Sequence, residues 1–479
     1  MPIHYALREA AAMDPRREER RLNAVPDRSA IAVAALALSV TLALPRAARA
    51  ETGPVTLPDS TVCESWRLPN GLGVTTRHVP RASAVSITVA YRIGNTGDPP
   101  GREGLARLMA EAAFTAAAGE IPERTRDEME SLRPLGWSLE VGSRSTLLTE
   151  IASPAQFPGA LHQVAVRMRG VMVNDRSLRT ALGTVKRELH EGYSGRADLA
   201  LYYQVRDAAA GLPEGLSETY ASGKGLQGIG VKEVRDGLAA LYVPANAVLS
   251  LAGNLSGVDL HRQIEREFGA LPSGARASDP PPVALKPGLR QITRGDLASP
   301  LGVVGIIAPA LTDTTHPEFY LNALVIGSLC KDVWDPPAPP LTTRFKYSVL
   351  DDPDLVRFYP PVSASTTEAR LVPEEYLLTL RESPSPGDAL YASIRLGVGW
   401  LLGGPLSFDA LKRARTQPGT LLLLSTSMAS RALAADDGFW ADYRRRLEQT
   451  DGSSFDAWRN YFLALNHRAS VLFSPGKRK

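Results

Sequence analysis

The sequence predicts an α+β fold of two homologous domains, each an antiparallel-rich sheet packed against helices. Three observations lead to this expectation. The chain has 479 residues, which is too long for one ordinary hydrophobic core. Segments with strand periodicity are mixed with segments of helical periodicity, without a regular strand–helix–strand order. A short segment of the first half also has a counterpart near the C-terminus, behind a proline-rich stretch.

The elements of the first half follow from local patterns. Asn70-Gly71 predicts a hairpin turn, because this pair tolerates positive-φ positions. Residues 85–93 alternate apolar and polar side chains and predict a strand with one buried face. The Ala-, Leu- and Met-rich residues 102–118 predict a helix. The later elements are a strand pair in 139–151, a helix opened by Ser153-Pro154 as N-cap and first-turn proline, helices over 176–192 and 231–243, and a strand over 247–252.

The domain boundaries are expected around a linker. Residues 273–288 are polar, small and proline-rich, and they separate a domain over 59–272 from one over 289–479. Residues 241–251 and 462–471 both resemble a helix end, an Asn turn and a strand, with Asn246 matching Asn466. This match favours a duplicated domain.

The N-terminus predicts export. Residues 29–44 are apolar and uncharged, arginines precede them, and Ala48-Arg49-Ala50 supplies a small-x-small cleavage pattern. We therefore expect residues 1–50 to be a cleaved signal peptide and the protein to be periplasmic or secreted, with no membrane contact after cleavage. The alternative is a membrane anchor, for which sixteen apolar residues are short.

The charge balance argues against a nucleic-acid partner. Residues 1–50 hold eight arginines and five acidic residues, and subtracting these from 54 and 51 leaves 46 of each sign in residues 51–479. Phosphate binding by counterion release needs a clustered cationic excess. The two cysteines, Cys63 and Cys330, allow either one disulfide bond or two buried thiols.

Several segments resemble the insulinase/pitrilysin family of zinc metallopeptidases, which includes the mitochondrial processing peptidases. The matching segments are LPNGL (68–72), ITVAYRIGNTGDPPG (87–101), GLARLMAEAAF (104–114), VKRELHEGY (185–193) and LYVPANAVLSLAGN (241–254). The resemblance covers about residues 59–475 and implies two similar domains joined by a linker.

The chain departs from the family at its zinc motif. The family carries HxxEH on its first helix, in which two His bind Zn²⁺ and the Glu activates water, and a distal Glu completes the ligands. Here Arg107 and Glu111 stand at the two His positions and Ala110 at the catalytic Glu, while Glu188 matches the distal ligand. We therefore expect no zinc cofactor and no catalytic residue. Our hypothesis is that the guanidinium of Arg107 bridges Glu111 and Glu188; otherwise all three are solvated.

The second half departs as well. Active heterodimeric members hold substrate with an Arg and a Tyr of the partner's second domain. Arg344 resembles that Arg and is a weak candidate for substrate binding, whereas Pro360 falls at the Tyr position beside Tyr359.

The resemblance therefore implies a non-catalytic member, the inactive subunit or scaffold of a heterodimeric peptidase. Its partners would be an HxxEH-bearing subunit and an extended peptide held at a sheet edge. The alternatives are a stand-alone periplasmic peptide-binding or chaperone-like protein, and an active zinc metalloendopeptidase with unrecognised ligands.

Overall fold

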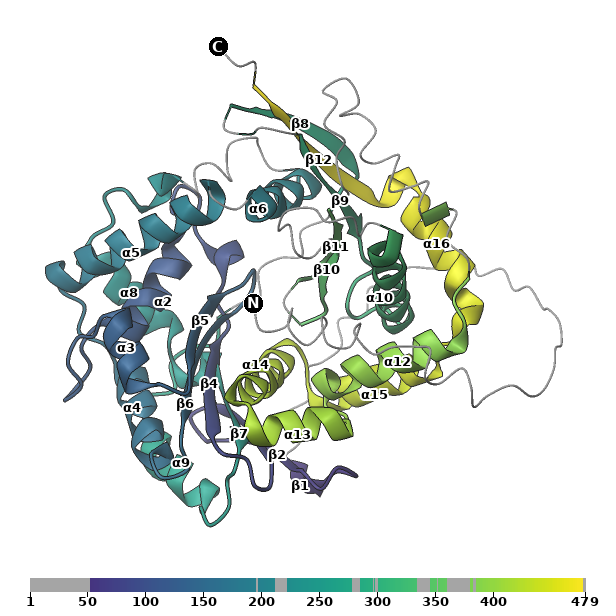
Figure 1. Cartoon of the computed structure of the whole chain (residues 1–479). Coiled ribbons are helices and arrows are strands. Elements are labelled where there is room, and N and C mark those ends of the chain that lie inside the picture. The colour runs from purple at the N-terminus through teal and green to yellow at the C-terminus, as the bar shows by residue number, and fades with distance from the viewer. Residues whose placement is uncertain are drawn as a thin grey trace.

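The computed structural model describes residues 52–194, 197–211, 222–277, 285–295, 297, 300–333, 345–350, 352–359, 380–381 and 385–476 (Figure 1). The predicted signal peptide and the centre of the predicted linker lie outside these residues. Within them, no helix is both long and apolar enough to cross a membrane.

Two sheets organise the described residues, which confirms the predicted α+β class. The first sheet has the strand order β1-β2-β3-β7-β4-β6-β5 and the second the order β10-β11-β9-β12-β8. The first-sheet strands are β1 (Thr52–Thr56), β2 (Val62–Arg67), β3 (Gly73–His78), β4 (Val85–Tyr91), β5 (Trp137–Val141), β6 (Thr146–Ala152) and β7 (Ala247–Gly253). The second-sheet strands are β8 (Gly288–Arg294), β9 (Leu301–Ile307), β10 (Phe345–Ser348), β11 (Asp352–Phe358) and β12 (Arg468–Pro475).

The two sheets share one topology over five strands. In the first sheet β3 and β7 are parallel, and β7–β4, β4–β6 and β6–β5 are antiparallel. In the second sheet β8 and β12 are parallel, and β12–β9, β9–β11 and β11–β10 are antiparallel. The strands β7 and β12, which carry the sequence match, therefore hold the same place in their sheets. This agreement is what a duplicated domain produces.

The matched segments also share their local layout. Helix α8 (Val231–Leu241) leads through the 3₁₀ turn Pro244–Asn246 into β7, and α16 (Phe455–Leu463) leads through Leu465–His467 into β12. The asparagines differ in role. Asn246 is buried and its Nδ2 donates to the carbonyl of Leu241 at 2.8 Å, whereas Asn466 is exposed.

Each half covers its own sheet with helices on one face. On the first sheet these are α2 (Leu105–Thr115), α4 (Phe157–Arg169), α5 (Asp175–Ser194), α8 and α9 (Leu260–Phe268), and their apolar side chains form one core. On the second sheet they are α10 (His316–Val333), α12 (Asp388–Gly399), α15 (Asp437–Gln449) and α16. Helix α13 (Phe408–Thr416) packs on α14 (Pro418–Ala434).

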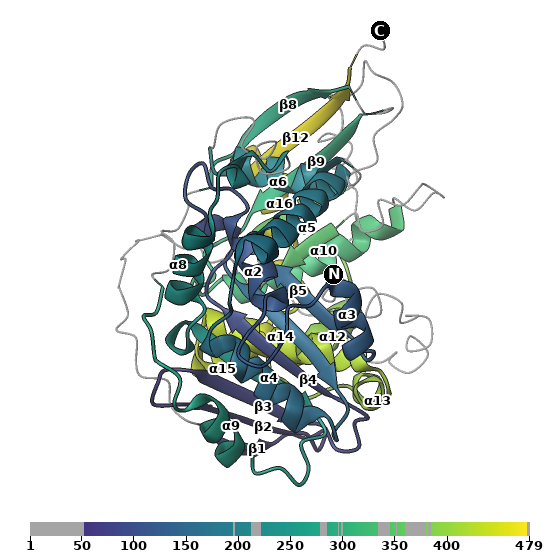
Figure 2. The same cartoon turned by 90° about the vertical axis from the view of Figure 1, so that its left-hand side faces the viewer.

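The halves exchange one helix each. Helix α14 of the second half packs on strands β3, β4, β6 and β7 of the first sheet, and α6 (Ala197–Ala209) of the first half packs on β8, β9 and β12 (Figures 1 and 2). The Ser425 hydroxyl of α14 lies 2.7 Å from the hydroxyls of both Ser86 and Thr88 on β4. Because these groups are buried, the polar contact fixes how the two halves are seated.

Two local expectations need correction. In the turn between β2 and β3 only Gly71 takes positive φ (90°), because the Asn70 side chain is held elsewhere by the carbonyls of Phe268 and Leu271. Helix α4 starts at Phe157 rather than at Ser153-Pro154, which forms a preceding turn, and a proline follows at its first turn. Among the described side chains Cys63 is a free thiol, and burial raises its pKa; the side chain of Cys330 lies outside them, so the choice between a disulfide bond and two thiols stays open.

Candidate functional site

The first turn of α2 is fixed by the half-buried carboxylate of Asp98. Gly104 precedes the helix with φ of 98°, a conformation that glycine adopts without strain. The Asp98 side chain accepts hydrogen bonds from the backbone N–H groups of Gly104 and Ala106, both at 2.7 Å. Two of the free N–H groups at the helix start are thereby satisfied, which sets the direction in which Arg107 projects.

Arg107 contacts Glu188, as the sequence hypothesis requires. Its Nη2 and Nε donate to Glu188 Oε2 at 2.8 and 3.2 Å. Its Nη1 donates to the backbone carbonyl of Leu139 on β5 at 3.3 Å. One guanidinium therefore joins α2, α5 and the edge of the first sheet.

The bridge between the two carboxylates is made by Arg126 instead of Arg107. Arg126 opens α3 (Arg126–Leu132), and its Nη2 and Nε lie 2.5 and 3.2 Å from Glu111 Oε2. Its Nη1 donates to Glu188 Oε1. The expectation that Arg107 bridges both carboxylates was therefore wrong in its second contact. Arg126 is the site residue that the sequence did not reveal, because it lies on another helix and at no helical spacing from the motif.

The cluster, defined as Arg107, Glu111, Arg126 and Glu188, is electrically balanced. Two guanidinium groups face two carboxylates, and the Glu111 side chain is only 3% exposed. Burial opposes ionisation of Glu188, but the charges and hydrogen bonds of Arg107 and Arg126 outweigh it and hold its pKa below the usual value. Glu188 is thus ionised and paired with both guanidinium groups at neutral pH.

The residues of the cluster do not fit Zn²⁺. A guanidinium stays protonated and has no lone pair for a metal, and here two of them bond the carboxylates that would be the remaining ligands. Ala110, which the resemblance places at the catalytic base, is fully buried against Phe114, Met129 and Leu139 and has no group to activate water. No grouping of three metal-binding side chains occurs within the described part of the chain.

Strand β5 beside the cluster is an edge strand. It pairs with β6 alone in the described sheet. At the two ends of β5, the Gly136 carbonyl accepts a hydrogen bond from the Ile151 N–H, and the Gly142 N–H donates to the Ser145 carbonyl. Backbone groups alternate sides in an antiparallel pair, so those of Trp137, Leu139 and Val141 point to the open edge. Among these outward groups, the Leu139 carbonyl receives Arg107.

The remaining sequence candidates lie in the second half. Arg344 and Pro360 fall outside the described residues, so the substrate-binding expectation for Arg344 stays a prediction. Tyr359 is 4% exposed and belongs to the core beneath α6. Such burial does not suit a residue that contacts substrate directly.

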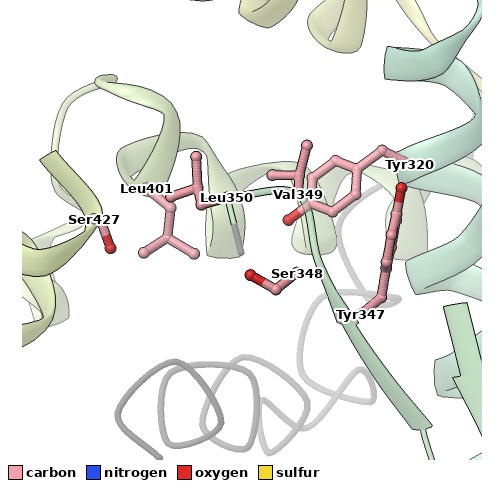
Figure 3. Close-up of a pocket in the computed structure, with 7 residues that line it drawn as sticks. All are labelled: Tyr320, Tyr347, Ser348, Val349, Leu350, Leu401 and Ser427. Atoms are coloured by element: carbon pink, nitrogen blue, oxygen red, sulfur yellow. The ribbon is translucent and has the colours of Figure 1, made fainter. Parts of the chain in front are cut away.

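A small cavity in the second half is unrelated to the cluster. Its volume is about 10 Å³, which holds about one water. Figure 3 shows its lining, which includes Tyr320, Tyr347 and Leu401, with the Ser427 hydroxyl of α14 at one side. This size excludes a peptide or cofactor.

Comparison with known proteins finds similarity in sequence and in fold. Residues 228–327 match a family model described as the Peptidase M16 inactive domain. An uncharacterized zinc protease of Rickettsia bellii is 20% identical over 219 residues, which are 45% of this chain and 52% of that protein. The aligned part is thus about half of the relative's length.

Solved structures share the fold. A protease from Helicobacter pylori superposes with a TM-score of 0.68 at 15% identity, covering 86% of this chain and 99% of that one. A peptidase M16 inactive domain from Pseudomonas fluorescens gives 0.63 at 13% identity, covering 87% and 99%. The periplasmic protease PqqL from Escherichia coli gives 0.61 at 12% identity, covering 88% of this chain and 48% of that one. These findings confirm the resemblance to the insulinase/pitrilysin (M16) family.

Proposed function

We propose that this chain is a non-catalytic, exported member of the insulinase/pitrilysin family that serves as the inactive subunit or scaffold of a two-component zinc peptidase. The observation that carries the proposal is the cluster itself. Two arginines bond both carboxylates at the place where relatives carry zinc ligands, and no residue there supplies a general base.

The proposed activity is to hold an extended peptide at β5. A peptide strand adding to this edge would pair with the outward backbone groups of Trp137, Leu139 and Val141. The Leu139 carbonyl is already engaged by Arg107, so the peptide would bond on either side of that point. Main-chain pairing gives affinity with little sequence preference, which suits a subunit that presents substrates to a catalytic partner.

Two features support the remaining parts of the proposal. The apolar run and cleavage pattern before residue 51 favour export, and one structural relative is named as a periplasmic protease. This chain also covers only 48% of the PqqL chain, which is consistent with a peptidase assembled from two units of this size. A stand-alone peptide-binding or chaperone-like protein is the second candidate, since it would use the same sheet edge.

Metal content tests the loss of catalysis. The purified protein is expected to hold no stoichiometric zinc and to show no chelator-sensitive peptide hydrolysis. The combined variant Arg107→His, Ala110→Glu, Glu111→His and Arg126→Ala restores the family motif beside Glu188 and removes the bridging guanidinium, so it should bind zinc and is the positive control. Stoichiometric zinc in the native protein, with hydrolysis abolished by a chelator, would establish the active peptidase instead.

Peptide binding tests the sheet edge. We expect Val141→Pro to weaken binding of fluorescein-labelled, carboxymethylated α-lactalbumin, a permanently unfolded chain, because proline removes an outward N–H without breaking the ladder to β6. Val141→Ala is the matched control and should bind like the native protein. Equal binding by both variants would refute the edge as the binding site.

Co-purification from the native host separates the two candidate functions. Recovery of an HxxEH-bearing protein supports the subunit function. A protein that purifies alone yet binds the unfolded chain supports the stand-alone function.

A further inference from the structure

Three arginines from α3, α4 and the segment before α3 surround Gln163 and Glu150 at a second place in the first half. Arg133, which ends α3, lies 2.6 Å from the Glu150 carboxylate through its Nε, and its Nη2 donates to Gln163 Oε1 at 2.9 Å. Arg124, just before α3, donates to the same Gln163 oxygen at 3.4 Å. Arg167 lies one turn after Gln163 on α4 and donates its Nη1 to the carbonyls of Ala116 and Ala113 at 2.8 and 3.3 Å.

This arginine group, defined as Arg124, Arg133 and Arg167, is not balanced by acids. Glu150 is the carboxylate bonded to it, so three positive charges less one negative charge leave an excess of two. Glu128 also acts on Arg124 through its charge, but its carboxylate caps α3 by accepting from the Thr125 N–H at 2.7 Å. The zinc-position cluster, in contrast, has two charges of each sign.

Burial and neighbouring positive charge lower the pKa values of Arg124 and Arg167. Burial lowers the pKa of Arg167 to about 10. The charges of Arg124 and Arg133 add to this effect, and the charge of Glu150 opposes it. Burial lowers the pKa of Arg124 as well, and the charge of Arg133 adds to this effect, while Glu150 and Glu128 oppose it. Like charges at this proximity destabilise one another unless an anion lies between them.

One donor of the group is buried without a partner. Arg167 Nη2 has no hydrogen-bond acceptor among the described residues, although the atom is shielded from solvent. A buried donor of this kind costs free energy unless an acceptor reaches it. Glu150 and Arg133 are each at least nine-tenths buried, whereas Arg124 is partly exposed, so an anion bonded to the group would be reached from solvent past Arg124.

We propose that Arg124, Arg133 and Arg167 form a binding site for a small dianionic oxyanion, phosphate or a phosphate monoester. Planar guanidinium groups match the oxygens of such anions and bond them through charge-assisted hydrogen bonds. An excess of two positive charges favours a dianion over chloride or a monocarboxylate. The site is separate from the zinc-position cluster and needs neither a peptide nor a partner subunit.

Calorimetric titration of the purified protein with inorganic phosphate tests the site, with O-phosphoserine as the monoester and sodium chloride at matched ionic strength as the reference. We expect saturable one-to-one binding of at least one of the two phosphate compounds, and the tighter one identifies the source of the oxyanion. Arg124→Gln should weaken that binding about tenfold, because it removes one charged donor. Arg169→Gln on α4 removes an exposed charge of the same sign and should bind like the native protein.

A second variant keeps all three arginines. Gln163→Glu places a carboxylate at the oxygen that Arg124 and Arg133 already bond, so it should raise the melting temperature and abolish phosphate binding. Phosphate affinity unchanged in Gln163→Glu or Arg124→Gln would overturn the proposal. So would a heat of titration that sodium chloride reproduces.

Discussion

The pairing of Arg126 with Glu111 should be the main stabilising contact of the zinc-position cluster. The Glu111 side chain is 3% exposed, and Arg126 is its charged partner among the described residues. Arg126→Leu leaves that carboxylate buried without a counter-charge, which costs about 3 kcal/mol in comparable buried pairs. For a unit of 150–250 residues this corresponds to a melting temperature lower by about 6–12 °C.

The reciprocal change should cost less. In Glu111→Met, Arg126 keeps Glu188 and its side chain is 27% exposed, so we expect a loss of about 1 kcal/mol. The double variant replaces both charges by apolar side chains and should lie within about 1 kcal/mol of the native protein. Urea unfolding followed by far-UV circular dichroism measures all three, and Arg169→Leu is the exposed control, expected within about 0.5 kcal/mol. If the double variant loses the sum of the two single losses, the pair is not coupled and our reasoning is refuted.

Three further predictions concern pH and the contact between the halves. The pKa of Glu188 is lowered on folding, so its stabilising contribution is present above the unfolded pKa near 4.5 and is lost as pH falls through the folded pKa. In Glu188→Gln the melting temperature should therefore fall less steeply toward acid pH, in melting curves recorded between pH 3 and 7. Burial raises the pKa of Asp98 to about 7, and the charge of Glu103 adds to the shift, so the native protein loses stability as this carboxyl ionises. Asp98→Asn should therefore gain stability relative to the native protein as pH rises from 5 to 8.5. A stability difference that stays constant over this range would contradict the prediction. Ser425→Ala leaves the Ser86 and Thr88 hydroxyls without their contact across the halves and should cost about 1–2 kcal/mol, with Ser430→Ala as the control on the same helix.

The sequence predicted the α+β class, most strands and helices of the first half, and the relation between the halves. These features follow from periodicity and from short repeated patterns, which act over a few residues. The match of residues 241–251 with 462–471 located two equivalent strands, although the buried contact of Asn246 has no counterpart at Asn466.

What the sequence by itself determined at the site is chemical identity: the resemblance sets Arg107, Ala110 and Glu111 at the positions where the family carries its zinc-binding and water-activating residues, and Glu188 at the distal ligand. Only the tertiary structure decided which charges meet. Arg126 lies 15 residues beyond Glu111 and 62 before Glu188, and folding brings it to both. The physical reason is that side-chain pairing within one helix is set by spacing, whereas pairing between helices is set by how their faces pack on a sheet.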